Sequence, residues 1–292
     1  MLYETQPPSV LIGQAKLAIV EAKRLGVDQL HRFEEYVHIL EEFAALPFPR
    51  KEPWGERAAV TWEATAQCQQ LVTSTRIWSK VDPSALKAAL LKVGRGDLLP
   101  PDEGDDQPRN TLLELTTGAL LNARGFSVDL TVGNEDVIAA VPGVPPFSIE
   151  CKRPASPKGL LRNLKDAKSQ LETRYRAGKQ HGMAVLGVDR VLGLTDGGLV
   201  ARDAEHIATV VHGKLGSLRN DLRRVMADSP EYALFPSTPL FGFVLVGSVF
   251  NLHDGVPVAI QQLSLSCSGP EDHEISKHLL DTISPRFEER GV

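Results

Sequence analysis

The amino-acid sequence predicts an α/β protein in which helices come first and a mixed sheet follows. Apolar residues recur at helical spacing across residues 1–96, whereas after residue 110 the pattern becomes helix, strand, strand, strand, helix, strand. Between these parts the chain concentrates glycine, proline and acidic residues, a composition that favours a solvated connection. We therefore expect an all-helical N-terminal domain over 1–96, a linker over 97–109 and an α/β domain over 110–292.

Four helices are predicted for the N-terminal part. The apolar spacing from Leu11 to Leu46 is interrupted near Gly26, which indicates two helices. Three prolines make the following segment a connector, and Asp82 and Pro83 are a typical N-cap and first helical residue. The two helices after the connector are expected over 56–78 and 83–93.

The α/β part is predicted from its turn residues and strand alternation. A helix capped by Asn110 or Thr111 should end at Gly125, before an alternating strand over 126–132. A proline- and glycine-rich turn over 142–146 separates two strand-like runs, which predicts a hairpin. The hairpin strands, a helix and a buried strand are expected over 136–141, 147–151, 160–177 and 183–188. Beyond them we expect a helix with a break near 213–217, two strands and a final helix, over 204–226, 241–252, 256–266 and 273–283.

The composition excludes several classes of protein. The three cysteines are widely spaced and odd in number, so neither a disulfide framework nor a zinc knuckle is indicated. No apolar run approaches the roughly 20 residues that span a bilayer, and the N-terminus lacks the pattern of a leader peptide. We therefore expect a cytoplasmic protein without a membrane segment. The net charge of -5 means that any nucleic acid must meet a local basic surface.

Acidic and basic side chains gather on the predicted hairpin. Asp136 opens its first strand, and Glu150 and Lys152 lie two residues apart on the second, so their side chains share one face. The intervening Cys151 then points into the core. Metal-assisted hydrolysis of a phosphodiester bond needs hard oxygen ligands for a divalent cation and a positive charge near the phosphate. The hairpin supplies both kinds of group.

This arrangement resembles the PD-(D/E)XK nuclease superfamily. Within that superfamily it is most similar to the branch of archaeal Holliday-junction resolvases and Mrr-like restriction enzymes. The resemblance rests on the spacing from Asp136 to the Glu-x-Lys pair and on the flanking elements, and it covers residues 110–188. It implies a restriction-endonuclease-like αβββαβ core with a central mixed sheet. The residues to which it assigns a part in catalysis are Glu114, Asp136, Glu150, Lys152 and Gln170.

The resemblance also implies what each group does. Lys152 would orient the attacking water or stabilise the charge on the phosphate, and Gln170 would hold water or phosphate nearby. Glu135, and not proline, precedes Asp136, which leaves open which acid faces the metal, although strand alternation favours Asp136. The implied ligands of a magnesium or manganese ion are Glu114, Asp136, Glu150 and the backbone carbonyl of Cys151.

A basic stretch follows the hairpin. Residues 151–179 hold nine lysines and arginines against two acids, which is the kind of local surface that meets phosphates. The alternative is a solvated helix face with no binding role. The residues that we predict to contact nucleic acid are Lys152, Arg153, Lys158, Arg162, Lys165, Lys168 and Arg174.

These features predict a magnesium-dependent deoxyribonuclease, with endonuclease activity favoured and RNA the less favoured substrate. A setting in phage defence, restriction or mobile-element biology is expected, and a homodimer is the simplest way to cut both strands of a duplex. Two alternatives keep the same fold: a non-catalytic nucleic-acid-binding module, and a regulatory subunit whose helical half docks a protein partner. In a purely structural alternative, Glu150 and Lys152 are an exposed pair on a solvated sheet face.

Overall fold

The computed structural model shows an α/β fold with a mixed sheet, which confirms the fold class predicted from the sequence. It describes residues 8–46, 57–101, 106–130, 137–178, 181–193, 200–201, 204–229, 240–251 and 257–267. The helices are α1 (Pro8–Arg24), α2 (His31–Ala44), α3 (Ala58–Trp78), α4 (Pro83–Val93), α5 (Gln107–Asn122), α6 (Pro157–Gly178) and α7 (Ala204–Asp228). The strands are β1 (Ser127–Asp129), β2 (Val137–Val141), β3 (Val144–Lys152), β4 (Gly182–Gly187), β5 (Val200–Ala201), β6 (Leu240–Asn251) and β7 (Pro257–Cys267).

The sheet combines antiparallel and parallel pairs. β1, β2 and β3 pair antiparallel, β4 is parallel to both β3 and β6, and β7 is antiparallel to β6. The short strand β5 pairs parallel with the end of β6. The run α5, β1, β2, β3, α6, β4 has the order helix, strand, strand, strand, helix, strand that the sequence predicts for the core.

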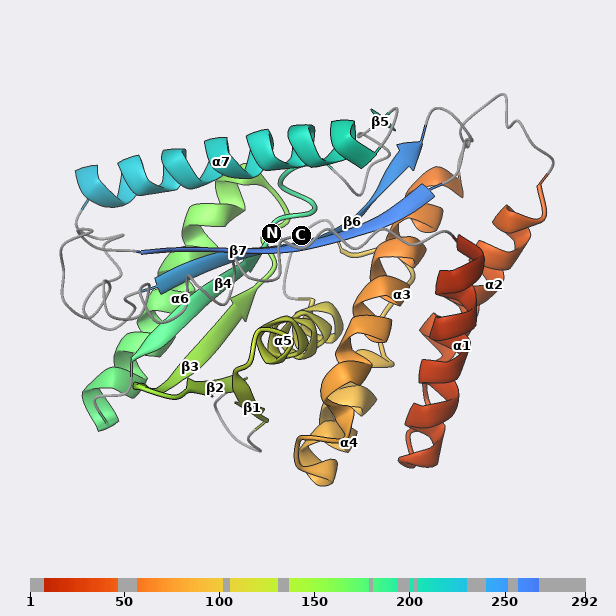
Figure 1. Cartoon of the computed structure of the whole chain (residues 1–292), viewed down its shortest axis with the longest axis horizontal. Helices are drawn as coiled ribbons and strands as arrows, with labels where there is room; N and C mark the ends of the chain where they lie inside the picture. Colours follow the sequence, from red (N-terminus) through yellow and green to blue (C-terminus); the bar gives the residue numbers. More distant parts are fainter. Residues whose placement is uncertain are drawn as a thin grey trace.

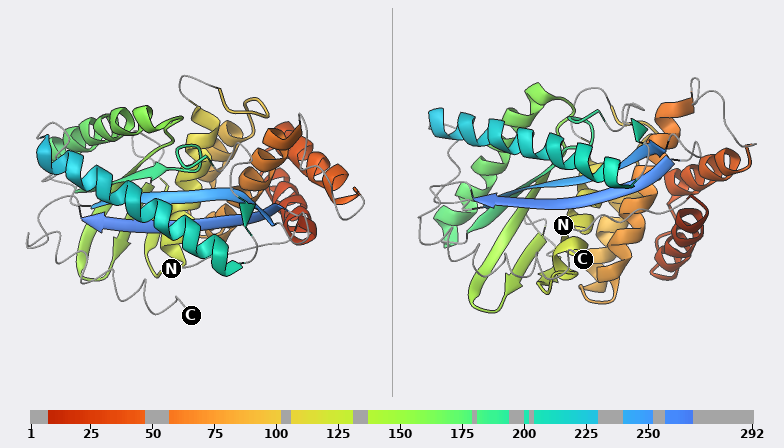
Figure 2. Two further views of the ribbon diagram at one scale, coloured as in Figure 1. Left: turned by 90° about the horizontal axis from the view of Figure 1, so that it is seen from above. Right: turned by 45° about the horizontal axis from the view of Figure 1, so that its top comes forward.

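Helices cover both faces of the sheet. In Figure 1, α7 lies above β6 and β7, whereas α5 and α3 lie below them, and Figure 2 shows the same layers from two further directions. Alternate residues of β4 divide between the two layers, as strand geometry requires. Met183 and Val185 join the hydrophobic cluster of α1–α5, and Ala184 and Leu186 join that of α6 and α7.

The N-terminal helices form as the sequence predicts. Gly26 follows α1 with a φ of 79°, a left-handed conformation that suits glycine and ends the helix. The Asp82 side chain accepts hydrogen bonds from the backbone N–H groups of Ser84 and Ala85, each at 2.9 Å, and so caps α4. The predicted N-cap is confirmed.

Of these helices, α3 packs directly on β6 and β7, and α1 touches β7. A single hydrophobic cluster includes Leu11 of α1, Leu40 of α2 and Leu71 of α3 together with Val185 of β4 and Leu263 of β7. The segment predicted as a solvated linker is tied down in part, because the backbone carbonyls of residues 97 and 98 accept hydrogen bonds from a buried arginine of α5. The N-terminal helices and the sheet therefore belong to one hydrophobic core, joined chiefly through α3.

Helix α5 begins earlier than predicted. The expected cap was Asn110 or Thr111, but the helix starts at Gln107 and its N-cap is Asp106, which accepts a hydrogen bond from the Arg109 N–H at 3.4 Å. Pro108 stands in the first turn, where its missing N–H costs nothing. The first turn of α5 therefore falls inside the predicted linker.

The hairpin and the last described helix also differ from expectation. The hairpin turn is tighter, with Gly143 at a φ of 85° and β3 beginning at residue 144. Pro145 and Pro146 fall where the register between β2 and β3 shifts, so the ladder does not need their missing N–H groups. The break expected near 213–217 is wrong: α7 is continuous there, because its apolar side is held against the second hydrophobic cluster through Val211, Leu215, Leu222 and Met226.

Several expected features fall outside the described residues, namely Glu135, Asp136 and the final helix over 273–283. Among the described helices, none combines the length and apolarity needed to cross a membrane.

Candidate active site

Four of the predicted catalytic residues line one cavity. Glu114 on α5, Glu150 and Lys152 on β3 and Gln170 on α6 border a space of about 460 Å³. The structure thus brings together side chains from three elements that are separated along the chain. The other residues that line this cavity are Gln107, Asn110, Thr111, Cys151, Thr173 and Arg174.

Glu150 is a buried carboxylate held by two cations. Its side chain is 2% exposed, with Oε1 at 2.7 Å from Lys152 Nζ and Oε2 at 3.1 Å from Arg174 Nη2. Lys152 Nζ also donates a hydrogen bond to Gln170 Oε1 at 3.3 Å. The reading of Glu150 and Lys152 as an exposed pair on a solvated face is therefore wrong, because the carboxylate lies beneath α6.

Strand geometry explains how this pair is presented. Glu150 and Lys152 stand opposite Ala184 and Leu186 of β4, on the face that α6 and α7 cover. Cys151 points to the other face, where its Sγ lies 3.7 Å from the Thr117 hydroxyl oxygen. The predicted burial of Cys151 in the core is confirmed.

Helix α5 approaches the sheet closely and brings Glu114 to the cavity. A methyl group at Gly118 would lie 3.1 Å from Val128 Cγ1 and 3.3 Å from Ile77 Cδ1, so only glycine fits there without displacing a neighbour. Glu114 stands one turn earlier, half-buried at the wall of the cavity. Glu114 and Glu150 therefore line the same space from different elements.

The predicted metal ligands are only partly within the described structure. Asp136 and its competitor Glu135 lie outside the described residues. Within those residues no group of three or more histidine, cysteine or acidic side chains is placed to hold a metal ion. The described donors are two carboxylates and the main chain at Cys151. Oxygen donors of this kind suit Mg²⁺, which proteins commonly bind through one or two carboxylates together with substrate phosphates.

A second, larger cavity adjoins the first. It has a volume of about 1000 Å³ and shares Asn110, Lys152 and Gln170 with its neighbour, so the two cavities adjoin along α6; we call the larger one the groove. Lys158 and Arg162, both predicted to contact nucleic acid, line it and are exposed. Its other lining residues are Asp106, Arg153, Ala155, Ser156, Gly159, Asn163, Asp166 and Ser169.

The remaining predicted contacts to nucleic acid lie in different settings. Lys165 is exposed on α6, and Lys168 pairs with Glu172 one turn later at 3.6 Å. Arg174 faces Glu150 in the first cavity instead of open solvent.

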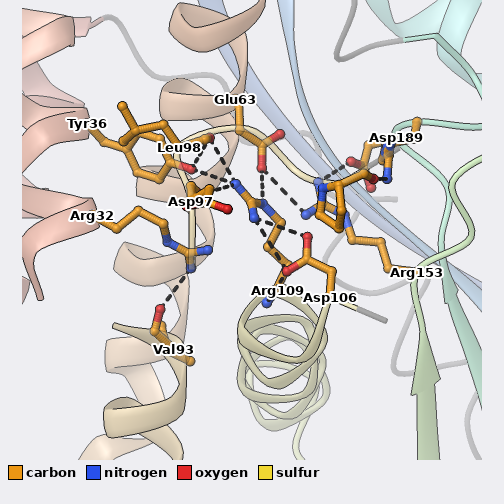
Figure 3. Close-up of polar contacts among 12 residues, drawn as sticks. Arg32, Tyr36, Glu63, Val93, Asp97, Leu98, Asp106, Arg109, Arg153 and Asp189 are labelled. Atoms are coloured by element: carbon orange, nitrogen blue, oxygen red, sulfur yellow. Dashed lines mark hydrogen bonds and ion pairs between the residues drawn. The ribbon is translucent and has the colours of Figure 1, made fainter. Parts of the chain in front are cut away.

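Arg153 is the exception among the basic residues. Its side chain is 2% exposed and is ion-paired with Asp189, two residues after the end of β4, and with Glu63 of α3 at 3.6 Å (Figure 3). Burial alone would lower the pKa of Arg153, but the two carboxylates raise it above its ordinary value. The prediction that Arg153 contacts nucleic acid at the surface is therefore wrong, because its guanidinium is buried and pairs with carboxylates inside the protein.

Glu63 is the centre of this buried cluster. Its Oε1 also accepts a hydrogen bond from Arg109 Nε of α5 at 2.6 Å, and both side chains are 1% exposed. Arg109 reaches further to the Tyr36 hydroxyl oxygen of α2 at 2.9 Å and to Asp106 at 3.1 Å. Burial alone would raise the pKa of Glu63, yet Arg153 and Arg109 lower it below its ordinary value, so the carboxylate is ionised.

Sequence reasoning did not find this cluster. One signal was available: Glu63 is the one charged residue in the segment 58–75, and the only other charge on α3 is Arg76 in its last turn. A lone acid in a helix that is buried on several sides requires a cationic partner. The sequence gives no indication that the partners lie 46 and 90 positions away, at Arg109 and Arg153.

Comparisons of the chain with protein-family models, with curated proteins and with solved structures found no match.

Proposed function

We propose that this protein is a metal-dependent nuclease that hydrolyses phosphodiester bonds of DNA, with cleavage inside the strand favoured. The observation that carries the proposal is the single cavity bordered by Glu114, Glu150, Lys152 and Gln170, which opens into a groove lined by Lys158 and Arg162. Carboxylates, a lysine and a cationic track for the substrate are the groups that metal-assisted phosphodiester hydrolysis needs.

A magnesium or manganese ion would be held by Glu114 and Glu150, joined by the carbonyl of Cys151 and by Asp136 as the resemblance to PD-(D/E)XK nucleases implies. When bound, such an ion polarises the phosphate and lowers the pKa of a water molecule. Glu150 is suited to this task because its carboxylate is fixed by a buried position on the central sheet.

Lys152 supplies the positive charge beside the scissile phosphate. Its ammonium lies between Glu150 Oε1 and Gln170 Oε1, which restrict it to the junction of the two cavities. An ammonium held there stabilises the charge that develops on phosphate oxygens during displacement. Gln170 borders both cavities, so its amide is placed to hydrogen-bond water or phosphate at the same junction.

The groove along α6 accounts for binding of a polyanion by a chain whose net charge is -5. Lys158 and Arg162 are exposed on the groove side of the helix, with Lys165 on the exposed surface of the same helix. Contacts of this kind bind the backbone without reading its sequence. Cleavage of both strands of a duplex would be achieved by a homodimer with one site in each subunit.

The test is a plasmid-cleavage assay on the purified full-length chain. Supercoiled DNA incubated with Mg²⁺ or Mn²⁺ should be nicked or linearised, and excess EDTA should stop the reaction. Glu150→Gln, which keeps the size of the side chain, should remove cleavage while DNA binding persists. Cleavage by Glu150→Gln at the wild-type rate would refute the proposed site.

A non-catalytic nucleic-acid-binding protein is the second candidate, and one observation favours it. The two oxygens of Glu150 face Lys152 and Arg174, so protein groups alone compensate this charge. Such a protein would bind DNA through α6 with a strong salt dependence and would leave plasmid intact with either metal. A regulatory subunit would in addition require its protein partner before any cleavage was seen.

A further inference from the structure

Lys152 and Arg153 leave the end of β3 in opposite directions. The Lys152 ammonium lies in the cavity with Glu150, whereas the Arg153 guanidinium is buried between Asp189 and Glu63 (Figure 3). Because the two residues are joined by one peptide unit, the position of the Arg153 side chain limits how this peptide can rotate. A fixed Arg153 therefore restricts the direction of Lys152.

The route of Arg153 across the sheet is narrow. Lys152 stands opposite Leu186 in β4, so Arg153 comes next to Gly187, the last residue of that strand. A methyl group on Gly187 would lie 3.3 Å from Arg153 Cγ and 3.0 Å from a methyl of Leu113. The arginine thus passes over a position that has no room for a larger side chain. Packing limits the position of the aliphatic part of Arg153, and two carboxylates pair with its guanidinium.

One of these carboxylates comes from the N-terminal helices. Glu63 lies on α3, and its Oε1 is shared between Arg109 at 2.6 Å and Arg153 at 3.6 Å. Without the charge of Glu63, two buried guanidinium groups would retain only Asp106 and Asp189 as acidic partners in this cluster. Arg153 would then be drawn toward Asp189 alone or toward the groove that it borders.

We propose that Glu63 is a positioning residue for the site: by holding Arg153 from the far side of the sheet, it keeps Lys152 directed at Glu150 and Gln170. The N-terminal helical part thereby contributes to the framework of the site without touching the groove. The effect on cleavage rests on the proposed nuclease function, but the placement of Lys152 does not, so the two are tested separately.

Placement is measured by amine labelling. Full-length protein is treated briefly with an acetylating reagent, and the extent of labelling at Lys152 is divided by that at the exposed Lys158 in the same sample. In Glu63→Gln this ratio should rise by at least about threefold, the size expected when an ion pair of modest strength is loosened. The matched control is Glu41→Gln, which removes an exposed acid of the N-terminal helices that pairs with Lys16 at 2.5 Å. Its ratio should equal that of wild type.

A conservative variant separates positioning from folding. Glu63→Asp keeps the buried negative charge but withdraws the carboxylate by one methylene, so the fold should persist while the hold on Arg153 weakens. Its Lys152 labelling ratio should lie between those of wild type and Glu63→Gln. The ratio is measured on the folded fraction of each variant. If Glu63→Asp and Glu63→Gln both give the wild-type ratio of Lys152 to Lys158 labelling, Glu63 does not position Lys152.

The consequence for catalysis is read from the kinetics. In Glu63→Asp, kcat should fall by roughly tenfold or more, as expected for a misplaced catalytic group, while KM changes by less than about twofold. A loss of stability alone would lower the amount of active protein in an active-site titration and leave kcat per folded site unchanged, which would overturn the positioning role. If wild type does not cleave DNA at all, the proposed nuclease function fails and the labelling ratio still decides the placement of Lys152.

Discussion

Arg174 of α6 reaches across to Glu150 of β3, with 3.1 Å between its Nη2 and the carboxylate Oε2. This pair connects the helix that carries the basic groove to the strand that carries the candidate ligands. Arg174 therefore neutralises a buried carboxylate. The sequence did not suggest this role, since a cation at that position of a basic helix is ordinarily expected to face a phosphate.

The first prediction concerns this pair. Arg174→Gln should lower the free energy of unfolding by about 1–3 kcal/mol, the cost of leaving a buried polar group without its partner, because Glu150 is nearly fully buried and its Oε2 loses its cation. Arg176→Gln is the matched control: Arg176 is 81% exposed and lies 3.8 Å from Glu172, so its loss should cost about 0–0.5 kcal/mol. Urea denaturation followed by circular dichroism measures both. Equal effects in the two variants would contradict the buried role of Arg174.

Lys152 is the subject of the second prediction. Lys152→Ala should reduce metal-dependent cleavage about a hundredfold or more, because the ammonium next to the phosphate is lost. Binding of duplex DNA should change little, since the exposed cations of the groove remain. The control is Lys87→Ala, which removes an exposed lysine of α4 that lines neither cavity and should cleave at close to the wild-type rate. Rapid plasmid nicking by Lys152→Ala would exclude Lys152 from the reaction.

The third prediction concerns the groove. Lys158→Ala combined with Arg162→Ala should weaken DNA binding uniformly across sequences and reduce the slope of log K against log salt by about 1.8, that is, about 0.9 for each lost phosphate contact. Fluorescence anisotropy over roughly 50–200 mM salt gives this slope. The double control Lys23→Ala with Arg24→Ala, on α1, removes the same charge from another surface. If both doubles reduce the slope alike, the effect is that of net charge and the groove has no special role.

The fourth prediction is a pH dependence of stability. The folded-state pKa of Glu63 lies below its ordinary value of 4.5, so the unfolded chain binds the proton more readily. The contribution of Glu63 is therefore complete well above pH 4.5 and is lost as the pH falls toward the lowered pKa. At neutral pH, Glu63→Gln should cost about 3–5 kcal/mol because it leaves buried arginines without their acid.

Urea unfolding at a series of acidic pH values tests this assignment. The difference in stability between wild type and Glu63→Gln should shrink as the pH is lowered, whereas the difference between wild type and Glu41→Gln should stay small. A difference for Glu63→Gln that is constant from neutral to acidic pH would show that Glu63 is not ionised in the folded protein.

Much of the framework follows from local sequence rules. The cap at Asp82, the order of the core elements and the shared face of Glu150 and Lys152 all depend on residues a few positions apart, where capping and strand alternation apply directly. The contact of this pair with Gln170 does not follow from local rules alone. It depends in addition on how α6 packs against the parallel strands β3 and β4. Asp136 stays a prediction, because it lies outside the described residues.

Other features depend on contacts that local rules do not contain. Arg153 stands in a basic run and was expected at the surface, but Asp189 and Glu63 approach it from distant parts of the chain and make burial favourable. Gly213 and Gly216 indicated a break, yet the apolar side of α7 gains enough from packing to keep the helix continuous. In each case a tertiary contact outweighs the local preference of the residue.

The shared hydrophobic cluster of helices and sheet has a consequence for how the chain folds. Leu11 of α1 and Leu263 of β7 belong to the same cluster, although 252 positions separate them (263 minus 11). Contacts of such long sequence separation form slowly, because a large loop must close before they contribute. During synthesis, α1, α2 and α3 can pack on one another, but those of their apolar residues that meet β7 stay uncovered until that strand has been made. Chaperone dependence and slow refolding after dilution from denaturant are therefore expected of this chain.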